Sequence, residues 1–228
     1  MRRLLAATSA AAMSAALVMI GPATASAAAR TTCQGALPAG TYGTVVVPTD
    51  TVCFAQAFVR ITGGLYVRQG ATFALGSDED PTPSGVISGG VHATNAANVQ
   101  IHHARINGGI RIHGGSGPFY ATTPFCSPDE TTGETVCLTW NAIEEDHING
   151  AVVIDGYNGF WQGFLENHVN GSVRFNNNVL VDPDGNELVT NVIHGSLSCH
   201  GNSPAPQAGD SGGTPNVVSG AQKGQCAG

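Results

Sequence analysis

Lysine is almost missing from this chain: Lys223 is the only one in 228 residues, and charged residues make up only 11% of the sequence. Helical bundles and coiled coils are rich in Ala, Glu, Lys and Leu, so the composition argues against both. Proteins that bind nucleic acids carry clustered Lys and Arg, so no nucleic-acid partner is expected. A hydrophobic content of 42% and a formal net charge of −7 also disfavour disorder.

The first 27 residues are interpreted as a signal peptide that is removed. Arg2 and Arg3 give a positive start, Leu4–Ile20 is an apolar run, and Ala25–Ala27 forms an A-x-A cleavage signal. An uncleaved membrane anchor is the alternative, and the cleavage signal argues against it. No later segment is apolar enough to span a bilayer, so we expect a secreted, extracellular protein without a membrane partner. Removing Arg2 and Arg3 changes the formal net charge from −7 to −9.

All six cysteines lie in the mature chain, and an even number in an exported protein indicates disulfides. The sequence alone does not choose among the possible pairings. The simplest arrangement joins neighbours in sequence, as Cys33–Cys53, Cys126–Cys137 and Cys199–Cys226. Zinc ligation is the alternative, but the chain has no CxxC pairs and no zinc-type His spacing, so no metal site is expected from the cysteines.

Glycine, with 31 residues, recurs in the pattern apolar-x-Gly-x-apolar-x-apolar, for example in Ile106–Ile112 and Val169–Phe175. The central glycines are Gly43, Gly63, Gly89, Gly108, Gly150, Gly171, Gly195 and Gly220. The interval of 42 residues between Gly108 and Gly150 is the longest and contains Cys126 and Cys137. The interval is either two periods or one period plus an insertion, and the two cysteines favour an inserted disulfide loop at about 114–139.

Other positions repeat at fixed distances from these glycines. Apolar residues seven before the glycine are Ile101, Ile143, Phe164 and Leu188, and polar residues four before it are Asp146, Asn167, Asn191 and Asn216. Apolar residues two apart indicate strands. Asn and Gly at fixed places indicate corners, because both residues tolerate positive φ. Each period therefore predicts one rung of a coil, whose apolar face is buried by stacking on the next rung.

The repeat predicts an all-β fold, a parallel β-helix of about seven rungs that forms a single domain over residues 28–228. Its irregular spacing disfavours the left-handed form, which keeps a strict hexapeptide period. The chain resembles the right-handed parallel β-helix superfamily typified by pectate lyases, over roughly Thr41–Asn202. An antiparallel β-sandwich is the rival fold, but it does not explain equivalent residues at one distance from each glycine.

The tail, from about residue 200 to residue 228, carries a narrower resemblance. Leu197–Pro206, Pro215–Gly220 and Gly224–Cys226 look like the ending of small secreted β-helix proteins of Streptomyces, and small Streptomyces hyaluronidases are similar in size and repeat pattern. This resemblance implies carbohydrate chemistry without identifying catalytic residues. The physical interpretation is a C-terminal cap, because proline-rich backbone does not extend a ladder and a disulfide pins the tail.

Several cations fall at positions that alternation places outside the core, in a chain with few of them. With each central glycine as zero, Arg105, His147 and His168 occupy position −3, Arg111 and Arg174 occupy position +3, and His113 occupies position +5. Since stacked strands lie about 4.8 Å apart, we predict that these residues form one surface. An arginine-rich groove in an acidic protein predicts binding of an acidic extracellular polysaccharide.

This surface predicts a lyase that cleaves a uronate-containing, hyaluronan-like polysaccharide by β-elimination. An arginine neutralises the uronate carboxylate, a base removes the neighbouring carbon-bound proton, and an acid protonates the leaving oxygen. His147 or His168 is the predicted base, since imidazole titrates near neutral pH. Tyr157 is a candidate acid or base, and Glu166 is a candidate for orienting His168. Asn149 and Asn170, which precede central glycines, are either turn residues or hydrogen-bonding partners of the substrate.

Two alternatives to the lyase stay open. A glycoside hydrolase needs two carboxylates about 5–9 Å apart, and Glu145, Asp146, Asp155 and Glu166 are the candidates. A non-catalytic wall, matrix or glycan-binding protein would use the same polar residues only for stacking, solubility or adhesion. The run Glu144–Asp146 suggests calcium, but adjacent strand residues alternate faces and cannot all reach one ion, so no cofactor is expected. We expect a monomer.

The predicted insertion brings aromatic residues with it. Phe119, Tyr120, Phe125 and Trp140 lie in it or directly after it. These rings either form the floor of a sugar-binding cleft or pack the insertion onto the coil.

Overall fold

The computed structural model describes residues 29–55, 57–121, 123–128 and 132–227, and within them it contains strands and no helix. The predicted signal peptide, residues 1–27, lies outside the described residues. Accordingly, no helix in the described part of the chain has the length and apolarity needed to cross a bilayer.

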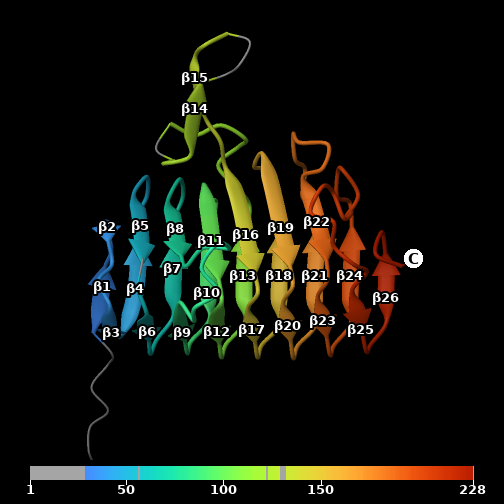
Figure 1. Ribbon diagram of the computed structural model, residues 1–228, viewed down its shortest axis with the longest axis horizontal. Coiled ribbons are helices and arrows are strands. Elements are labelled where there is room, and N and C mark those ends of the chain that lie inside the picture. The colour runs from blue at the N-terminus through green and yellow to red at the C-terminus, as the bar shows by residue number, and fades with distance from the viewer. Residues whose placement is uncertain (1–28, 56, 122, 129–131, 228) are drawn as a thin grey trace, which may run out of the picture.

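The strands form three parallel sheets, named A, B and C, and one separate hairpin (Figure 1). Sheet A runs in the order β1 (Arg30–Thr32), β4 (Thr44–Val47), β7 (Leu65–Val67), β10 (Val91–Thr94), β13 (Ile110–His113), β18 (Val152–Asp155), β21 (Val173–Asn176), β24 (Leu197–His200) and β26 (Gln222–Gly224). Sheet B runs in the order β2 (Gly35–Ala36), β5 (Val52–Ala55), β8 (Thr72–Leu75), β11 (Asn98–His102), β16 (Trp140–Glu144), β19 (Trp161–Leu165) and β22 (Asn186–Val189). Sheet C contains β3 (Gly40–Tyr42), β6 (Val59–Ile61), β9 (Gly85–Ile87), β12 (Ala104–Ile106), β17 (His147–Ile148), β20 (His168–Val169), β23 (Val192–Ile193) and β25 (Val217–Val218).

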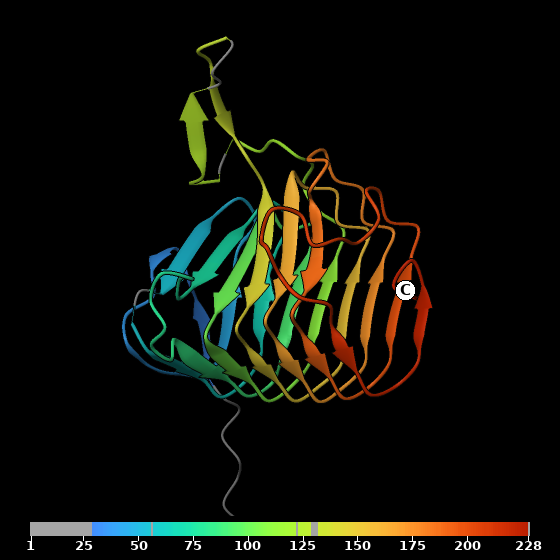
Figure 2. The same ribbon diagram turned by 45° about the vertical axis from the view of Figure 1, so that its right-hand side comes forward.

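The chain visits sheets C, A and B in turn, so that β6, β7 and β8 make one rung and β9, β10 and β11 make the next (Figures 1 and 2). Within the three sheets, strands of consecutive rungs pair in parallel, as β7 does with β10 and β8 with β11. This confirms the predicted parallel β-helix. Parallel pairing between rungs also excludes the antiparallel sandwich.

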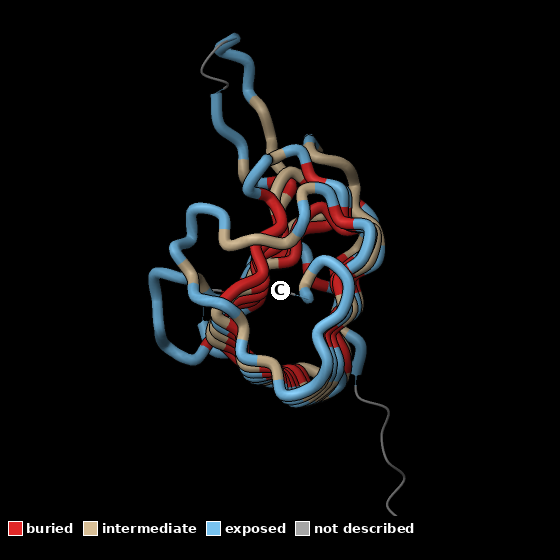
Figure 3. The backbone as a smooth tube through the Cα atoms, turned by 90° about the vertical axis from the view of Figure 1, so that its right-hand side faces the viewer, coloured by how far each residue is buried: buried red, intermediate tan, exposed pale blue. Residues whose placement is uncertain are grey.

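The core is the inside of the coil. In sheet A one column of buried apolar residues runs through Val45, Leu65, Val91, Ile110, Val152, Val173 and Leu197, and in sheet C another runs through Ile61, Ile87, Ile106, Ile148, Val169 and Ile193. These columns are the apolar positions that flank each central glycine. Figure 3, which looks along the coil, shows buried residues along the sheets and longer exposed stretches in the loops.

At the corner between sheets C and A, glycines of successive rungs stack closely on one another. A Cβ atom on Gly171 would lie 2.5 Å from the carbonyl oxygen of Gly150, and one on Gly150 would lie 2.5 Å from the backbone nitrogen of Gly109. Neither Gly150 nor Gly171 has a φ angle in the left-handed region. The corner is therefore predicted correctly, but the reason based on positive φ is wrong: glycine is required there by close backbone approach.

The asparagines four residues before the glycine form a buried ladder at the corner between sheets B and C. The Asn191 amide donates from Nδ2 to the Asn216 Oδ1 at 2.7 Å and to the Phe164 carbonyl at 2.7 Å. Its Oδ1 accepts the Asn167 backbone N–H at 2.9 Å. Asp146 continues the ladder, accepting the Ala104 N–H at 2.7 Å. These side chains form hydrogen bonds with backbone N–H and C=O groups at the corner that are not paired within a sheet. This confirms their structural role.

Three disulfides join neighbouring cysteines, as the simplest pairing predicts: Cys33–Cys53, Cys126–Cys137 and Cys199–Cys226. The second closes the antiparallel hairpin of β14 (Cys126–Pro128) and β15 (Thr135–Cys137), which lies between β13 and β16. The third pins the tail. The tail does more than cap the coil, because β25 and β26 add a further pair of strands to sheets C and A.

We expect Gly171→Ala to lower the free energy of unfolding by about 2 kcal/mol, because the new methyl group must displace the backbone of the preceding rung. Urea unfolding followed by circular dichroism measures this. Gly40→Ala is the matched control, since its Cβ would meet the Tyr42 ring at an ordinary 3.5 Å. Equal stability losses in the two variants would contradict the close-approach explanation.

Candidate functional site

Three of the predicted cations form a ladder on the outer face of sheet C. Strand pairing places Arg105 of β12 beside His147 of β17, and His147 beside His168 of β20. All three side chains are exposed. The two imidazole rings stack with centroids 5.0 Å apart and planes 18° apart. The part of the predicted surface formed by position −3 therefore exists, and it lies on sheet C.

Arg105 and His147 of this ladder line a cleft of about 370 Å³, which we call the sheet C cleft, whereas His168 lies one rung beyond its lining. Its lining comprises Phe58, Pro81, Pro83, Gly85, Val86, His103, Ala104, Arg105, Glu145 and His147. The prolines belong to the loop between β8 and β9, which forms one wall. A guanidinium, two imidazoles and a carboxylate thus share one open depression with apolar walls.

The other two arginines lie elsewhere. Arg111 of β13 and Arg174 of β21 are exposed on sheet A, and Val153 of β18 separates them. His113, also on sheet A, places its Nδ1 3.5 Å from the Asp155 Oδ2. The prediction of one surface holding all three arginines is wrong, because the glycine corner turns the chain between positions −3 and +3.

The asparagines that precede the glycines form a second, exposed ladder. Asn170 donates from Nδ2 to the Asn149 Oδ1 at 2.7 Å, and Asn149 donates to the Asn107 Oδ1 at 2.9 Å. The Arg105 Nε–H also donates to the Asn107 Oδ1, at 3.1 Å. The ladder thus holds the Arg105 side chain from one end. This favours a positioning role over direct substrate binding for Asn149 and Asn170.

Tyr157 is not part of any surface site. Its side chain is fully buried, and its hydroxyl donates to the Ala97 carbonyl at 2.9 Å. Burial also raises the pKa of this hydroxyl above the usual value for tyrosine. The prediction of Tyr157 as a catalytic acid or base is therefore wrong: the ring that the sequence places just beyond a strand turns into the core.

The predicted insertion leaves sheet C open. The β14–β15 hairpin projects at the edge of the coil away from β12, β17 and β20 (Figures 1 and 2). Aromatic residues of the insertion pack onto the coil. Phe125 stacks on Trp140 with ring centroids 4.7 Å apart, and the ring centroids of Phe119 and Phe160 are 6.3 Å apart. They do not form the floor of the sheet C cleft.

A second cleft, of about 360 Å³, lies on the outer face of sheet B and was not predicted. The lining of this sheet B cleft comprises Asp78, Gln100, His102, Trp140, Ala142, Glu144, Phe160, Trp161 and Asp182. The small Ala142 side chain leaves room for the depression, and Trp161 donates from Nε1 to the Glu187 Oε1 at 3.2 Å. This cleft combines aromatic walls with several carboxylates.

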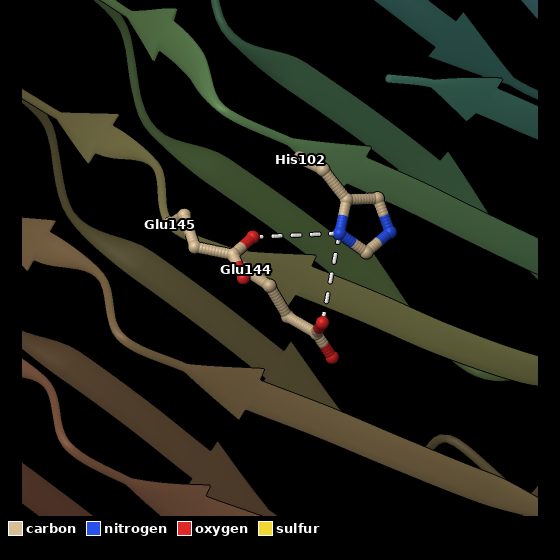
Figure 4. A group of neighbouring side chains, drawn as sticks. All are labelled: His102, Glu144 and Glu145. Atoms are coloured by element: carbon tan, nitrogen blue, oxygen red, sulfur yellow. Dashed lines mark ion pairs between the residues drawn. The ribbon is translucent and has the colours of Figure 1, made fainter. Parts of the chain in front are cut away.

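The corner between β16 and β17 joins the two clefts. His102 Nδ1 lies 3.5 Å from the Glu144 Oε2 and 3.5 Å from the Glu145 Oε2, as Figure 4 shows. Glu144 lines the sheet B cleft, whereas Glu145 lines the sheet C cleft. The same Glu145 Oε2 also lies 3.9 Å from the His103 Nε2.

Adjacent glutamates converge here because the backbone breaks its alternation. Glu145 has φ of 55°, in the left-handed region, and the equivalent corner residues His103 and Glu166 have φ of 52° and 57°. Glu144, Glu145 and Asp146 do not all reach one point, as expected, because Asp146 turns inward and is fully buried. Glu144 and Glu145 nevertheless meet at His102, since the corner falls between them. A positive φ at a non-glycine residue leaves no clear mark in one sequence.

Burial sets the protonation of this cluster. It raises the pKa of Glu144 to about 8, helped by the nearby carboxylates of Glu145 and Asp78. It lowers the pKa of His102 to about 4. Both side chains are therefore largely neutral at pH 7, so their 3.5 Å contact is not a charged pair. Burial also raises the pKa of Glu145.

The four carboxylates considered for hydrolysis do not form one site, and only Glu145 and Glu166 lie at neighbouring corners. Asp146 is fully buried, and burial raises its pKa well above the usual range. Asp155 lies on sheet A, next to His113. Glu145 and Glu166 occupy equivalent corners of consecutive rungs, and Glu166 is exposed. Of these four, only Glu145 lines the sheet C cleft.

Comparison with known proteins adds no assignment: no family model, no curated protein and no solved structure matches the chain. The functional argument therefore rests on the geometry of the two clefts.

We expect Glu144→Gln to change how stability depends on pH. The folded state raises the pKa of Glu144 from 4.5 to about 8, so folding favours the protonated form, and the wild type loses stability as pH rises from about 4.5 to 8. Glutamine does not ionise, so Glu144→Gln does not lose this part of the free energy of unfolding as pH rises. Urea unfolding at pH 5, 7 and 9, in buffer free of divalent cations, should show an advantage for the variant that grows with pH. Parallel curves for the two proteins would refute the assignment.

Proposed function

We propose that the mature protein is a secreted polysaccharide lyase that cleaves a uronate-containing, hyaluronan-like polymer by β-elimination in the sheet C cleft. The observation that carries this proposal is the pairing of β12 with β17, which sets Arg105 beside His147 at the edge of one cleft. The three disulfides are typical of extracellular proteins and are consistent with such a substrate.

Arg105 has the first task, which is to bind the uronate carboxylate. A guanidinium binds a carboxylate through two parallel hydrogen bonds and withdraws charge from it, which makes the hydrogen on the neighbouring carbon more acidic. The hydrogen bond from Arg105 to Asn107 fixes one side of the guanidinium. The apolar residues Phe58, Pro81 and Pro83, which line the same cleft, would contact the apolar face of the sugar.

His147 has the second task, which is to remove that proton from carbon. The electron pair of the broken carbon–hydrogen bond forms the carbon–carbon double bond, the glycosidic carbon–oxygen bond on the next carbon breaks, and the leaving oxygen keeps that bond's electrons and takes a proton. His168, stacked on His147, is the donor of that proton. The consecutive rungs thus supply the carboxylate-binding group, the base and the acid in one row.

Products identify the reaction. We expect purified mature protein, incubated with hyaluronan, pectate, alginate or heparin, to release chains with an unsaturated end, detected by their ultraviolet absorbance. New reducing ends without that absorbance would instead indicate hydrolysis. Binding of the polymer without any product would indicate the non-catalytic glycan-binding alternative, and either outcome would overturn the lyase proposal.

Substitutions of Arg105 and His147 test the roles proposed for these two residues. His147→Ala is expected to lower kcat/KM by about 10²–10⁴-fold, because general base catalysis contributes that much. Arg105→Lys keeps the charge but removes the bidentate contact, so it should raise KM and lower kcat. His194→Ala is the control, since His194 is an exposed histidine of a later rung outside the cleft. Unchanged rates in His147→Ala would discard the base assignment.

A further inference from the structure

The geometry points to a divalent metal site of the zinc class at His102, Glu144 and Glu145, on the corner between the two clefts (Figure 4). Each of the three residues offers one ligand atom, and these three atoms all lie within 4.8 Å of one another. This inference does not depend on the proposed lyase activity.

Unpartnered buried atoms are the first observation behind it. The His102 imidazole is only 7% exposed, and its Nδ1 has no hydrogen-bond partner. The Glu145 Oε2, 3.5 Å away, is also buried without a hydrogen-bond partner. Both atoms point into the space between the three side chains. A buried acceptor without a donor is costly, and a cation between them satisfies both.

The local charge is the second observation. Asp78 and Asp182 line the sheet B cleft together with Glu144, and no arginine or lysine lines it. Within the part of the chain that the structure describes, the cluster makes ion-pair contacts only among its histidines and glutamates. A divalent cation bound to the two glutamates in their deprotonated form would neutralise both carboxylates, where no arginine or lysine of this cleft does so.

The distances fit a small ion better than calcium. Zinc bonds of about 2.0–2.2 Å in a tetrahedron place neighbouring ligand atoms about 3.3–3.6 Å apart. The two contacts from His102 Nδ1 are each 3.5 Å. Calcium needs about six to eight oxygen ligands, more than this cluster provides. Because His102 and Glu144 line the sheet B cleft, the fourth position of the ion would open into that cleft.

Two features of the fold bring the ligands together. The β11–β16 register places His102 directly beside Glu144. The left-handed corner at Glu145, with φ of 55°, then turns the next side chain back towards the same point. One nitrogen and two carboxylate oxygens therefore come from two consecutive rungs that the coil already holds rigidly.

Calorimetric titration of the mature protein, freed of metal with a chelator, tests the site. We expect ZnCl₂ to bind with one ion per chain and to raise Tm, and CaCl₂ to bind much more weakly. Cobalt should give the visible absorption of a tetrahedral site. His102→Ala and Glu144→Gln should each lower zinc affinity by at least about 10-fold. Glu166→Gln, the equivalent corner acid one rung later, is the matched control and should bind zinc as the wild type does.

Circular dichroism confirms that each variant is folded, and His102→Gln replaces His102→Ala if the latter is not. Absence of saturable zinc binding by the wild type would overturn the site. Equal affinity in the wild type and in both ligand variants would show an adventitious ion only, with the same consequence. Since binding is measured without substrate, a failed lyase assay does not affect this result.

Discussion

The distance between rungs is the constraint on which the rest of this structure depends. At the corner between sheets C and A the backbones of Gly150 and Gly171 approach so closely that no side chain fits between them. This contact keeps consecutive strands in register, which lets backbone hydrogen bonds run the length of each sheet. Apolar side chains then fill the inside of the coil in columns, and the buried asparagine ladder satisfies the corner groups that the strands leave over.

The same register produces the candidate chemistry. Residues at equal positions become neighbours, so Arg105, His147 and His168, which are far apart in sequence, form one row on sheet C. The corners bring side chains together in a second way. Where the backbone enters the left-handed region at Glu145, alternation is interrupted and two successive carboxylates reach one imidazole. Strand faces therefore provide rows of exposed groups, whereas corners provide compact buried clusters.

The sequence was sufficient for the fold because its signals are local and repeated. Apolar residues two apart around each glycine, and Asn191 and its equivalents four before it, predict strand, corner and rung together. The site was harder for physical reasons. The spacing of residues along the chain does not show the angle between two sheets, so the sequence wrongly predicts Arg111 and Arg174 beside Arg105. It also does not show where a side chain points after a corner, so it predicts neither the meeting of Glu144 and Glu145 at His102 nor the burial of Tyr157.

The positions of the disulfides have a consequence for durability. In a stack whose units touch only their neighbours, opening begins at an end, because a terminal rung has a partner on one side alone. Cys33–Cys53 ties the first strands to the following rung, and Cys199–Cys226 ties the last strands to the one before. Fraying is thus blocked covalently where it would start. A protease that needs a detached, extended segment finds neither end of the coil free to supply one.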